Sequence, residues 1–337
     1  MNTFVPLGTV SRDGVIESTH LGDLVVADQT GKIVAGMGDP NRLAYYRSSS
    51  KPLQALTVVQ SGAADKFALT DTELAICCAS HHGCRIHVLT VRGILEKLGL
   101  DETALACGVH DPVDTEEHHR LIREGLRPSP LHNNCSGKHA GMLASALALE
   151  APVAGYLALT HPVQQSIMRN LELATGVPQE QFRIGTDGCG APTVAVPLQA
   201  MATSFARLAN PENMAGDFQV AARRLAAAMA IAPEMISSPG AFNSELLAAG
   251  EGRLVAKGGA EGLFCVGISD PRGLGLAVKE ADGSGRALAP VVLHLLKALG
   301  AVSAAGLEQL ASFVEPEVRN CHGAVVGSVE VVFDIAL

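Results

Sequence analysis

The segment DLVVADQTGKIVA, residues 23–35, decides the expected fold. Residues 23–27 and 32–35 are rich in Val, Ile and Ala, which favours β-strands, and the turn-forming residues 28–31 lie between them, so the segment predicts a β-hairpin. Strand-like runs separated by Gly and Asp recur near the other end of the chain, over 253–257, 263–268, 275–278 and 323–337. Tight turns between neighbouring strands predict a mainly antiparallel sheet built from both chain ends.

The middle of the chain has a helical pattern instead. Thr70-Asp71 with Glu73 is a helix-start signal, and Gly99 and Gly176 follow expected helix ends. The expected helices cover 53–60, 71–78, 87–98, 142–149, 163–175, 198–208 and 218–230. The prediction is an α+β fold forming one catalytic unit, 1–337, with sheet-forming segments 1–50 and 250–337 and a mainly helical region 51–249 that carries the active-site loops.

Composition narrows the class of ligand. The 337 residues include 34 acidic and 25 basic side chains, for a net charge of −9, and no Lys/Arg cluster, so we expect a small-molecule substrate and no nucleic acid. Residues 1–6 lack a basic region followed by an apolar run, and the apolar stretch 140–149 stops at Glu150, so neither a secretory signal nor a membrane span is expected. Eight sparse cysteines favour a cytoplasmic location.

The stretch RSSSKPL, residues 47–53, places Ser48 and Lys51 three residues apart at an expected helix start. A neutral Lys51 can take the Ser48 proton and prepare the serine for acyl transfer. Pro52 is tolerated only near the first helical turn, which places Ser48 where backbone N–H groups favour negative charge. The alternative is a helix cap followed by a solvent-exposed lysine.

Lys257-Gly258-Gly259 follows at the end of an expected strand. Serine β-lactamases and penicillin-binding proteins pair S-x-x-K with a later Lys-x-Gly on an edge strand, and a glycine lets a substrate backbone approach closely. The two motifs together favour an acyl-transfer site over a strand end with a plain Gly turn.

The run CCASHHGC, residues 77–84, with His87 beyond it, suggests zinc through Cys78, His81, Cys84 and His87. Structural zinc sites usually bring two separated ligand pairs together, so four ligands at every third residue fit poorly. We expect instead a helix that ends in a tight turn and presents Ser80 and His81.

The densest group of reactive side chains is HNNCSGKHAGML, residues 132–143, with an expected helix opening at Met142. A second glycine-rich turn, GTDGCGAP at 185–192, offers Asp187 and Cys189. For this second turn the alternative is a tight turn around a buried cysteine.

The run NNCSGKHAGM at 133–142, with RSSSKP at 47–52 before it and GTDGCGAP at 185–192 after it, resembles the rhizobial-type (class 3) L-asparaginases. The similarity extends from the N-terminal hairpin to the segment that follows Lys257. That family is similar in fold to serine β-lactamases and serine-type glutaminases. The resemblance implies two Ser-Lys pairs, Ser48 with Lys51 and Ser80 with Lys257. It also implies a zinc site and a substrate-binding set; the zinc ligands are Cys135, Lys138 and Cys189, and the substrate-binding residues are Arg47, His139 and Asp187. Two soft sulfurs beside an open position suit zinc better than Mg²⁺ or Ca²⁺.

The chain departs from the family pattern at a few positions. The family usually reads Ser-His-Ser-Gly-Glu after Ala79, where this chain has His82 and Cys84, and Asn243 stands about where one branch carries a further cysteine. These differences bear on substrate affinity and metal dependence rather than on the reaction.

The expected function is hydrolysis of L-asparagine to L-aspartate and ammonia through an acyl-enzyme, with Ser48 as nucleophile and Lys51 as base. The resemblance also implies a homodimer. A glutaminase or related amidase is the alternative within this chemistry, because one methylene in an apolar pocket is worth only about 1–3 kcal/mol. A non-catalytic amino-acid- or zinc-binding module is the alternative from another class, and penicillin hydrolysis is a distant third.

Overall fold

The protein is described by a computed structural model that covers residues 3–335. Its chain folds into two compact units. Unit 1 comprises Met1–Ser49, Val196–Asn210 and Glu245–Leu337, and unit 2 comprises Ser50–Ala195 and Pro211–Ser244.

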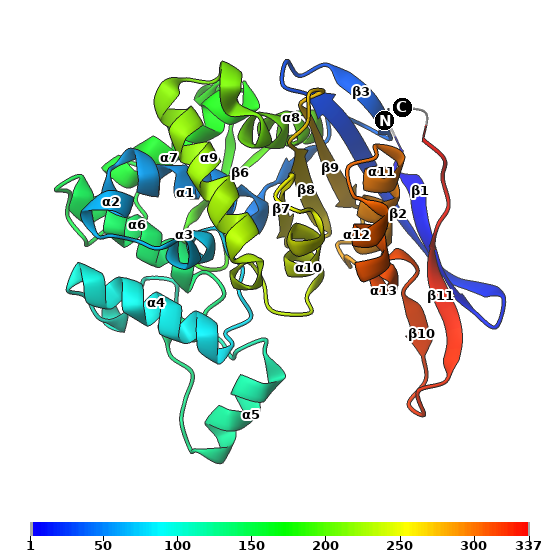
Figure 1. The fold of residues 1–337 in the computed structure, drawn as a ribbon, viewed down its shortest axis with the longest axis horizontal. Helices are drawn as coiled ribbons and strands as arrows, with labels where there is room; N and C mark the ends of the chain where they lie inside the picture. The colour runs from blue at the N-terminus through cyan, green and yellow to red at the C-terminus, as the bar shows by residue number, and fades with distance from the viewer. Residues whose placement is uncertain (1–2, 336–337) are drawn as a thin grey trace. The chain divides into compact units, whose positions relative to one another are not determined.

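Unit 1 is built on an eight-stranded sheet in the order β10-β11-β1-β2-β9-β8-β7, with β3 also pairing β2 (Figure 1). Every one of these neighbouring strands pairs antiparallel. The strands are β1 (Val5–Arg12), β2 (Val15–Asp28), β3 (Ile33–Met37), β7 (Leu254–Gly259), β8 (Leu263–Ile268), β9 (Leu274–Glu280), β10 (Glu317–Arg319) and β11 (Val325–Val331). The sheet therefore joins both chain ends.

Helix α8 (Leu198–Ala209) packs against this sheet at very short range. A Cβ atom added to Gly267 would lie 2.1 Å from the Phe205 carbonyl oxygen, and one added to Gly275 would lie 2.1 Å from that of Ala202. Glycine is required at both positions because any side chain would collide with the helix backbone. Unit 1 also contains β4 (Leu43–Tyr45), most of α10 (Phe242–Ala249), α11 (Leu288–Ala298), α12 (Ala304–Gln309) and α13 (Ala311–Val314).

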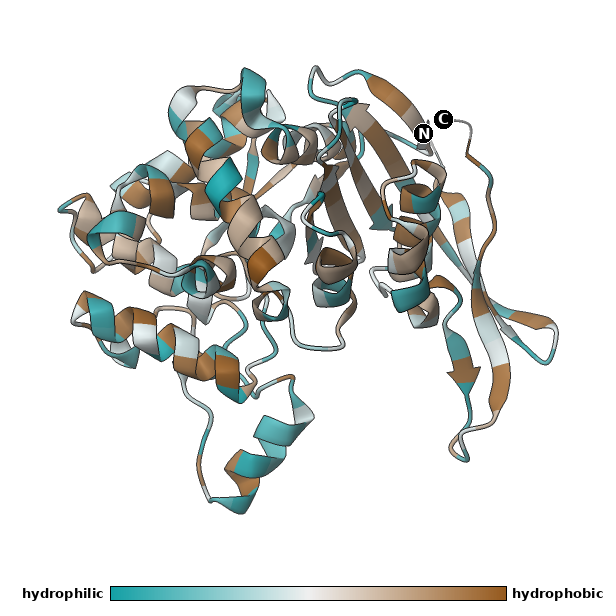
Figure 2. Cartoon of the chain, in the orientation of Figure 1, coloured by the Kyte–Doolittle hydropathy of each residue, from teal (hydrophilic) through white to brown (hydrophobic). Residues whose placement is uncertain are grey.

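Unit 2 is mainly helical. Helix α1 (Lys51–Gln60) packs against α6 (Ser136–Ala148), α7 (Pro162–Thr175) and α9 (Gly216–Ile231). The other helices are α2 (Ala63–Lys66), α3 (Asp71–Cys77), α4 (Arg85–Leu98) and α5 (Thr115–Arg123). Strand β5 (Arg183–Thr186) pairs antiparallel with β6 (Pro192–Pro197). Figure 2 shows that α5 is mostly polar and that strands of the eight-stranded sheet are apolar.

The sheet confirms the expected α+β class and the hairpin, which β2 and β3 form. Thr70 and Glu73 make a reciprocal capping box at the start of α3, as their spacing predicted. The strand predicted over 323–337 is β11, and the last two residues of that range lie outside the described residues. Over residues 3–335, no helix is both long and apolar enough to cross a bilayer.

One boundary prediction is wrong. The helix expected to open at Met142 begins at Ser136, so Lys138 and His139 are helical rather than part of a loop. The reason is tertiary packing, because Gly137 and Gly141 let this helix approach α3 closely. An added Cβ would lie 2.2 Å from the Ile76 carbonyl oxygen at Gly137 and 2.9 Å from the Cys77 sulfur at Gly141.

Candidate active site

Lys51 is the first residue of α1, and its side chain is completely buried. Its Nζ donates hydrogen bonds to the Ala79 carbonyl oxygen at 2.7 Å, to Ser80 Oγ at 2.9 Å and to the Asn134 carbonyl oxygen at 3.2 Å. Burial lowers the pKa of Lys51, and the nearby Cys135 sulfur opposes this shift only in part. When Lys51 loses one proton, two N–H groups still serve the two carbonyls and the lone pair is left for Ser80.

The contact between Lys51 and Ser80 is a pairing that the motif spacing did not predict. Ser80 lies just after α3, and its backbone N–H donates to the Ile236 carbonyl oxygen at 2.9 Å. The pairs predicted from the sequence, Ser48 with Lys51 and Ser80 with Lys257, each combine one residue of unit 1 with one of unit 2 and stay predictions.

The predicted zinc ligands lie together in unit 2. Cys135 directly precedes α6, Lys138 lies in its first turn, and Cys189 lies in the turn between β5 and β6. Lys138 Nζ donates to Cys189 Sγ at 3.1 Å. The ligand atoms of Cys135, Asp187 and Cys189 all lie within 4.8 Å of one another. The structure thus brings two separate motifs to one buried cluster.

The charges in this cluster are shared unequally. The hydrogen bond from Cys189 holds the pKa of Cys135 well below its usual range, and the nearby Lys51 and Lys138 add to this. The same bond raises the pKa of Cys189. Burial alone would lower the pKa of Lys138, but the Cys135 and Cys189 sulfurs outweigh it and raise that pKa. These opposite shifts favour the thiolate form at Cys135, and a metal ion bound by all three side chains would displace the protons held by Cys189 and Lys138.

His139, on α6, is also completely buried. Its Nδ1 lies 2.6 Å from the Tyr156 hydroxyl, which accepts the Ala106 backbone N–H at 2.8 Å. The hydroxyl proton is therefore available to Nδ1, which leaves the ring proton on Nε2. That Nε2 has no hydrogen-bond partner among the described residues. Burial holds the pKa of His139 well below its usual value, so the ring is neutral.

The remaining predicted residues belong to unit 1. Ser48 lies in the 3-10 turn Arg47–Ser50, and Arg47 adopts a left-handed backbone conformation with φ 49°. Lys257, on β7, is buried and donates to its neighbouring Gly258 carbonyl oxygen at 2.8 Å. A Cβ added to Gly259 would lie 2.8 Å from the Tyr46 carbonyl oxygen. The serine turn and the Lys-Gly-Gly segment are therefore neighbours, and glycine permits the close approach.

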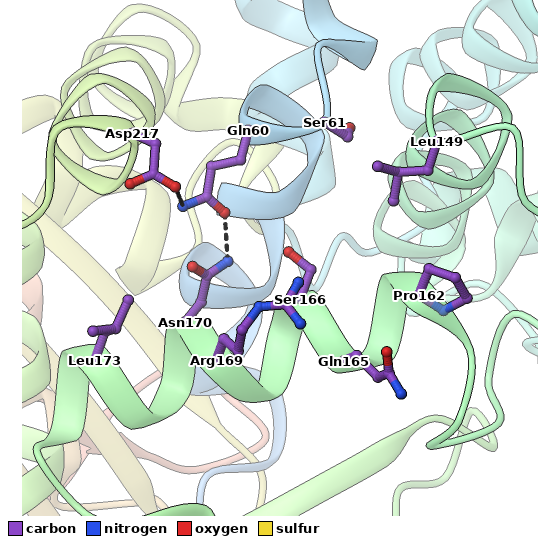
Figure 3. A pocket seen from close by; sticks show the side chains of 10 residues that line it. All are labelled: Gln60, Ser61, Leu149, Pro162, Gln165, Ser166, Arg169, Asn170, Leu173 and Asp217. Carbon is purple, nitrogen blue, oxygen red and sulfur yellow. Dashed lines mark hydrogen bonds between the residues drawn. The ribbon is translucent and has the colours of Figure 1, made fainter.

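Unit 2 also contains a cavity of about 370 Å³ (Figure 3). None of the predicted site residues lines it. Its walls come from the end of α1, from α7 and from the start of α9; they are formed by Gln60, Ser61, Leu149, Pro162, Gln165, Ser166, Arg169, Asn170, Leu173 and Asp217. The buried lysines and cysteines, rather than this cavity, carry the chemistry expected from the motifs.

Comparison with known proteins identifies the family. Residues 9–331 match the L-asparaginase II family. The chain belongs to the L-asparaginase II family. Membership indicates an asparaginase-type amidohydrolase that acts on a small-molecule substrate, which confirms the expected enzyme class and the expected resemblance. A comparison with curated proteins found no match.

Solved structures give distant likenesses. A protein called Mglu, in its native form, matches with a TM-score of 0.42 at 17% identity over 87% of this chain, and this chain spans 63% of Mglu. The Bacillus subtilis glutaminase YbgJ, in covalent complex with 5-oxo-L-norleucine, matches with a TM-score of 0.37 at 14% identity over 83% of this chain and 88% of the other. A Mycobacterium bovis β-lactamase matches with a TM-score of 0.41 at 15% identity over 87% and 95%.

The departures from the family pattern occupy structured positions. His82 Nδ1 lies 2.9 Å from Ser238 Oγ. Cys84 is half-buried, and burial together with Asp114 raises its pKa to about 12, so it is a poor thiolate. Asn243 is buried.

Two residues near the site were not predicted from the sequence. Tyr156 is a lone tyrosine in a stretch without a motif, and nothing in the sequence ties it to His139. Asn134 contributes through its backbone carbonyl, which no side-chain pattern can reveal.

Proposed function

We propose that this chain hydrolyses L-asparagine to L-aspartate and ammonia through an acyl-enzyme. The observation that carries the proposal is the hydrogen bond between the buried Lys51 and Ser80. A lysine whose pKa is lowered by burial exchanges protons more readily near neutral pH than an exposed one. Membership of the family supports the substrate class.

In the proposed reaction, Ser48 Oγ attacks the side-chain amide carbon of asparagine and its proton passes to Lys51 Nζ. Lys51 then protonates Ser80, whose own proton goes to the leaving nitrogen as the C–N bond breaks and ammonia departs. Water hydrolyses the serine ester by the reverse sequence of proton transfers and releases aspartate. Lys257 takes part with Ser80 in passing the proton to the leaving ammonia. Backbone N–H groups near Ser48 stabilise the negative charge that develops on the amide oxygen.

Substrate binding is assigned to Arg47, His139 and Asp187. The unpartnered N–H of His139 offers a donor to the substrate carboxylate, while the Asp187 carboxylate suits the substrate ammonium group. The Arg47 guanidinium supplies a positive charge for the same carboxylate.

Zinc fits the cluster of Cys135, Lys138 and Cys189, because two sulfurs and a nitrogen donor suit a borderline-soft ion. When bound, zinc would supply a positive charge that holds substrate. The Asp187 carboxylate lies within 4.8 Å of both cysteine sulfurs, so the proposed contact with the substrate ammonium group would be made beside the zinc.

The test is ammonia release from L-asparagine and L-glutamine in parallel, with zinc added. Release mainly from asparagine supports the proposal, whereas release mainly from glutamine moves the substrate within the same chemistry. Thermal stabilisation by asparagine without ammonia release would indicate a binding module. If Ser48→Ala kept near-normal turnover while Ser80→Ala abolished it, the roles of the two serines would be reversed.

We also propose a homodimer in the cytoplasm, as the resemblance implies. Light scattering would measure the mass in solution, and cell fractionation would locate the protein.

A further inference from the structure

Two segments of unit 2, residues 79–81 and 134–136, are joined by hydrogen bonds at both ends. At one end, Lys51 Nζ bonds to Ala79 and Ser80 on the first segment and to Asn134 on the second. At the other end, the His81 ring nitrogen Nε2 lies 2.8 Å from Ser136 Oγ. The first segment carries the serine that contacts Lys51, and the second carries Cys135.

The neighbouring hydrogen bonds determine which group donates in the bond between His81 and Ser136. The Gly83 backbone N–H donates to His81 Nδ1 at 3.2 Å, so Nδ1 carries the lone pair and Nε2 the proton. Nε2–H then donates to Ser136 Oγ, whose own proton goes to the Leu131 carbonyl oxygen at 3.0 Å. The three hydrogen bonds form one consistent chain that requires a neutral imidazole.

The surroundings hold this imidazole in place. The His81 ring is completely buried and stacks on His87 at a centroid distance of 5.0 Å. His87 Nε2 lies 3.0 Å from the Glu234 carbonyl oxygen. On either side of His81, the backbone N–H groups of Ser80 and His82 each donate at 2.9 Å to the segment 236–237.

We propose that His81 is a positioning residue that acts through Ser136 to hold Ser80 at the amine of Lys51. The inference rests on the proposed function, in which Ser80 passes a proton between Lys51 and the leaving group. Both ring nitrogens of His81 are engaged, Nδ1 by the Gly83 N–H and Nε2 by Ser136, so neither is left to contact substrate and the residue fixes geometry. Without the bond from His81 to Ser136, the hydrogen bonds that join the two segments within residues 3–335 would all come from Lys51.

The size of the effect follows from the sensitivity of catalysis to geometry, since a misplacement of about 1 Å costs up to about 100-fold in rate. We therefore expect Ser136→Ala to lower kcat by about 10–100-fold. KM should change less than kcat, because the variant removes no substrate contact.

Ser145→Ala is the matched control. Ser145 is also on α6 and completely buried, but its hydroxyl donates within its own helix, to the Gly141 carbonyl oxygen at 2.9 Å. Both variants remove one buried hydroxyl from one helix, so a purely structural role predicts equal effects on kcat. Equal effects would overturn the proposal.

A second pair of variants tests the histidine. In His81→Gln the amide nitrogen can occupy the place of Nε2 and keep the donor, whereas in His81→Asn the side chain reaches only the place of Nδ1. We expect His81→Gln to retain more kcat than His81→Asn at equal thermal stability. The opposite order contradicts the proposed link.

A readout without asparagine separates this inference from the proposed function. In Ser48→Ala protein, the rate at which a sulfonyl fluoride labels Ser80 is followed by peptide mass spectrometry. We expect Ser136→Ala to slow this labelling at least tenfold and Ser145→Ala to leave it within twofold. Labelling that is unchanged by Ser136→Ala, or absent in the Ser48→Ala protein, sinks the inference even if asparagine is hydrolysed. If asparagine is not hydrolysed but the labelling behaves as expected, only the proposed function fails.

Discussion

Replacing Tyr156 by Phe tests how His139 is held. The Tyr156 hydroxyl accepts the Ala106 N–H at 2.8 Å and lies 2.6 Å from His139 Nδ1. Phe keeps the ring and removes both bonds, leaving a backbone donor and a buried ring nitrogen without partners. An unsatisfied buried polar group costs about 1–3 kcal/mol, so the free energy of unfolding should fall by about that amount.

The same substitution should also weaken substrate binding, which would be measured as a rise in KM for asparagine. Without the tyrosine proton, Nδ1 of His139 can carry the ring proton itself, and the donor that Nε2 offers to substrate is lost. A hydrogen bond to a charged group is worth about 1.5–3 kcal/mol, which corresponds to about a 10–150-fold rise in KM for asparagine. We expect kcat to change by less than about threefold, because the interaction binds substrate and transition state alike.

The assays are steady-state ammonia release and urea unfolding, with Thr175→Val as control. The buried Thr175 hydroxyl likewise accepts a backbone N–H, from Val177 at 3.1 Å, and donates to the Leu171 carbonyl oxygen at 2.6 Å. Thr175→Val should lose similar stability and keep its KM. If both variants lost stability equally and KM rose in neither, His139 would not bind substrate through Nε2.

Three further predictions concern the base, the metal and the fold. Lys51→Met should lower kcat by about 10²–10⁴-fold, measured as ammonia release, because no other group replaces the base; near-normal turnover would exclude that role. Removing metal with a chelator should raise KM more than it lowers kcat, whereas complete loss of turnover would point to a metal-bound hydroxide. Gly275→Ala should markedly lower the free energy of unfolding measured in urea, because its Cβ would lie 2.1 Å from the Ala202 carbonyl oxygen. Gly93→Ala on α4 is the control: its nearest contact would be at 3.8 Å, so the free energy of unfolding should stay the same or rise.

Local patterns predicted the elements whose causes are local. The hairpin of β2 and β3 follows from a turn sequence between apolar runs, and the start of α3 follows from a capping box within four residues. The start of α6 was misplaced by six residues because the cause is not local. Gly137 and Gly141 read as helix breakers in isolation, but in the fold they allow α6 to pack onto α3.

The candidate site shows the same division. Residue types and spacing in the sequence predicted an acyl-transfer enzyme, and the family to which the chain belongs agrees with an amidohydrolase. The family resemblance had implied the grouping of Cys135, Lys138 and Cys189, whereas the contact between the Lys51 amine and Ser80 and the bond between Tyr156 and His139 are seen only in the tertiary structure. The physical reason is that Lys51 and Ser80 are 29 residues apart and His139 and Tyr156 are 17 residues apart, so each pair meets only when separate segments of the chain pack together. Burial then lowers the pKa of Lys51 and of His139.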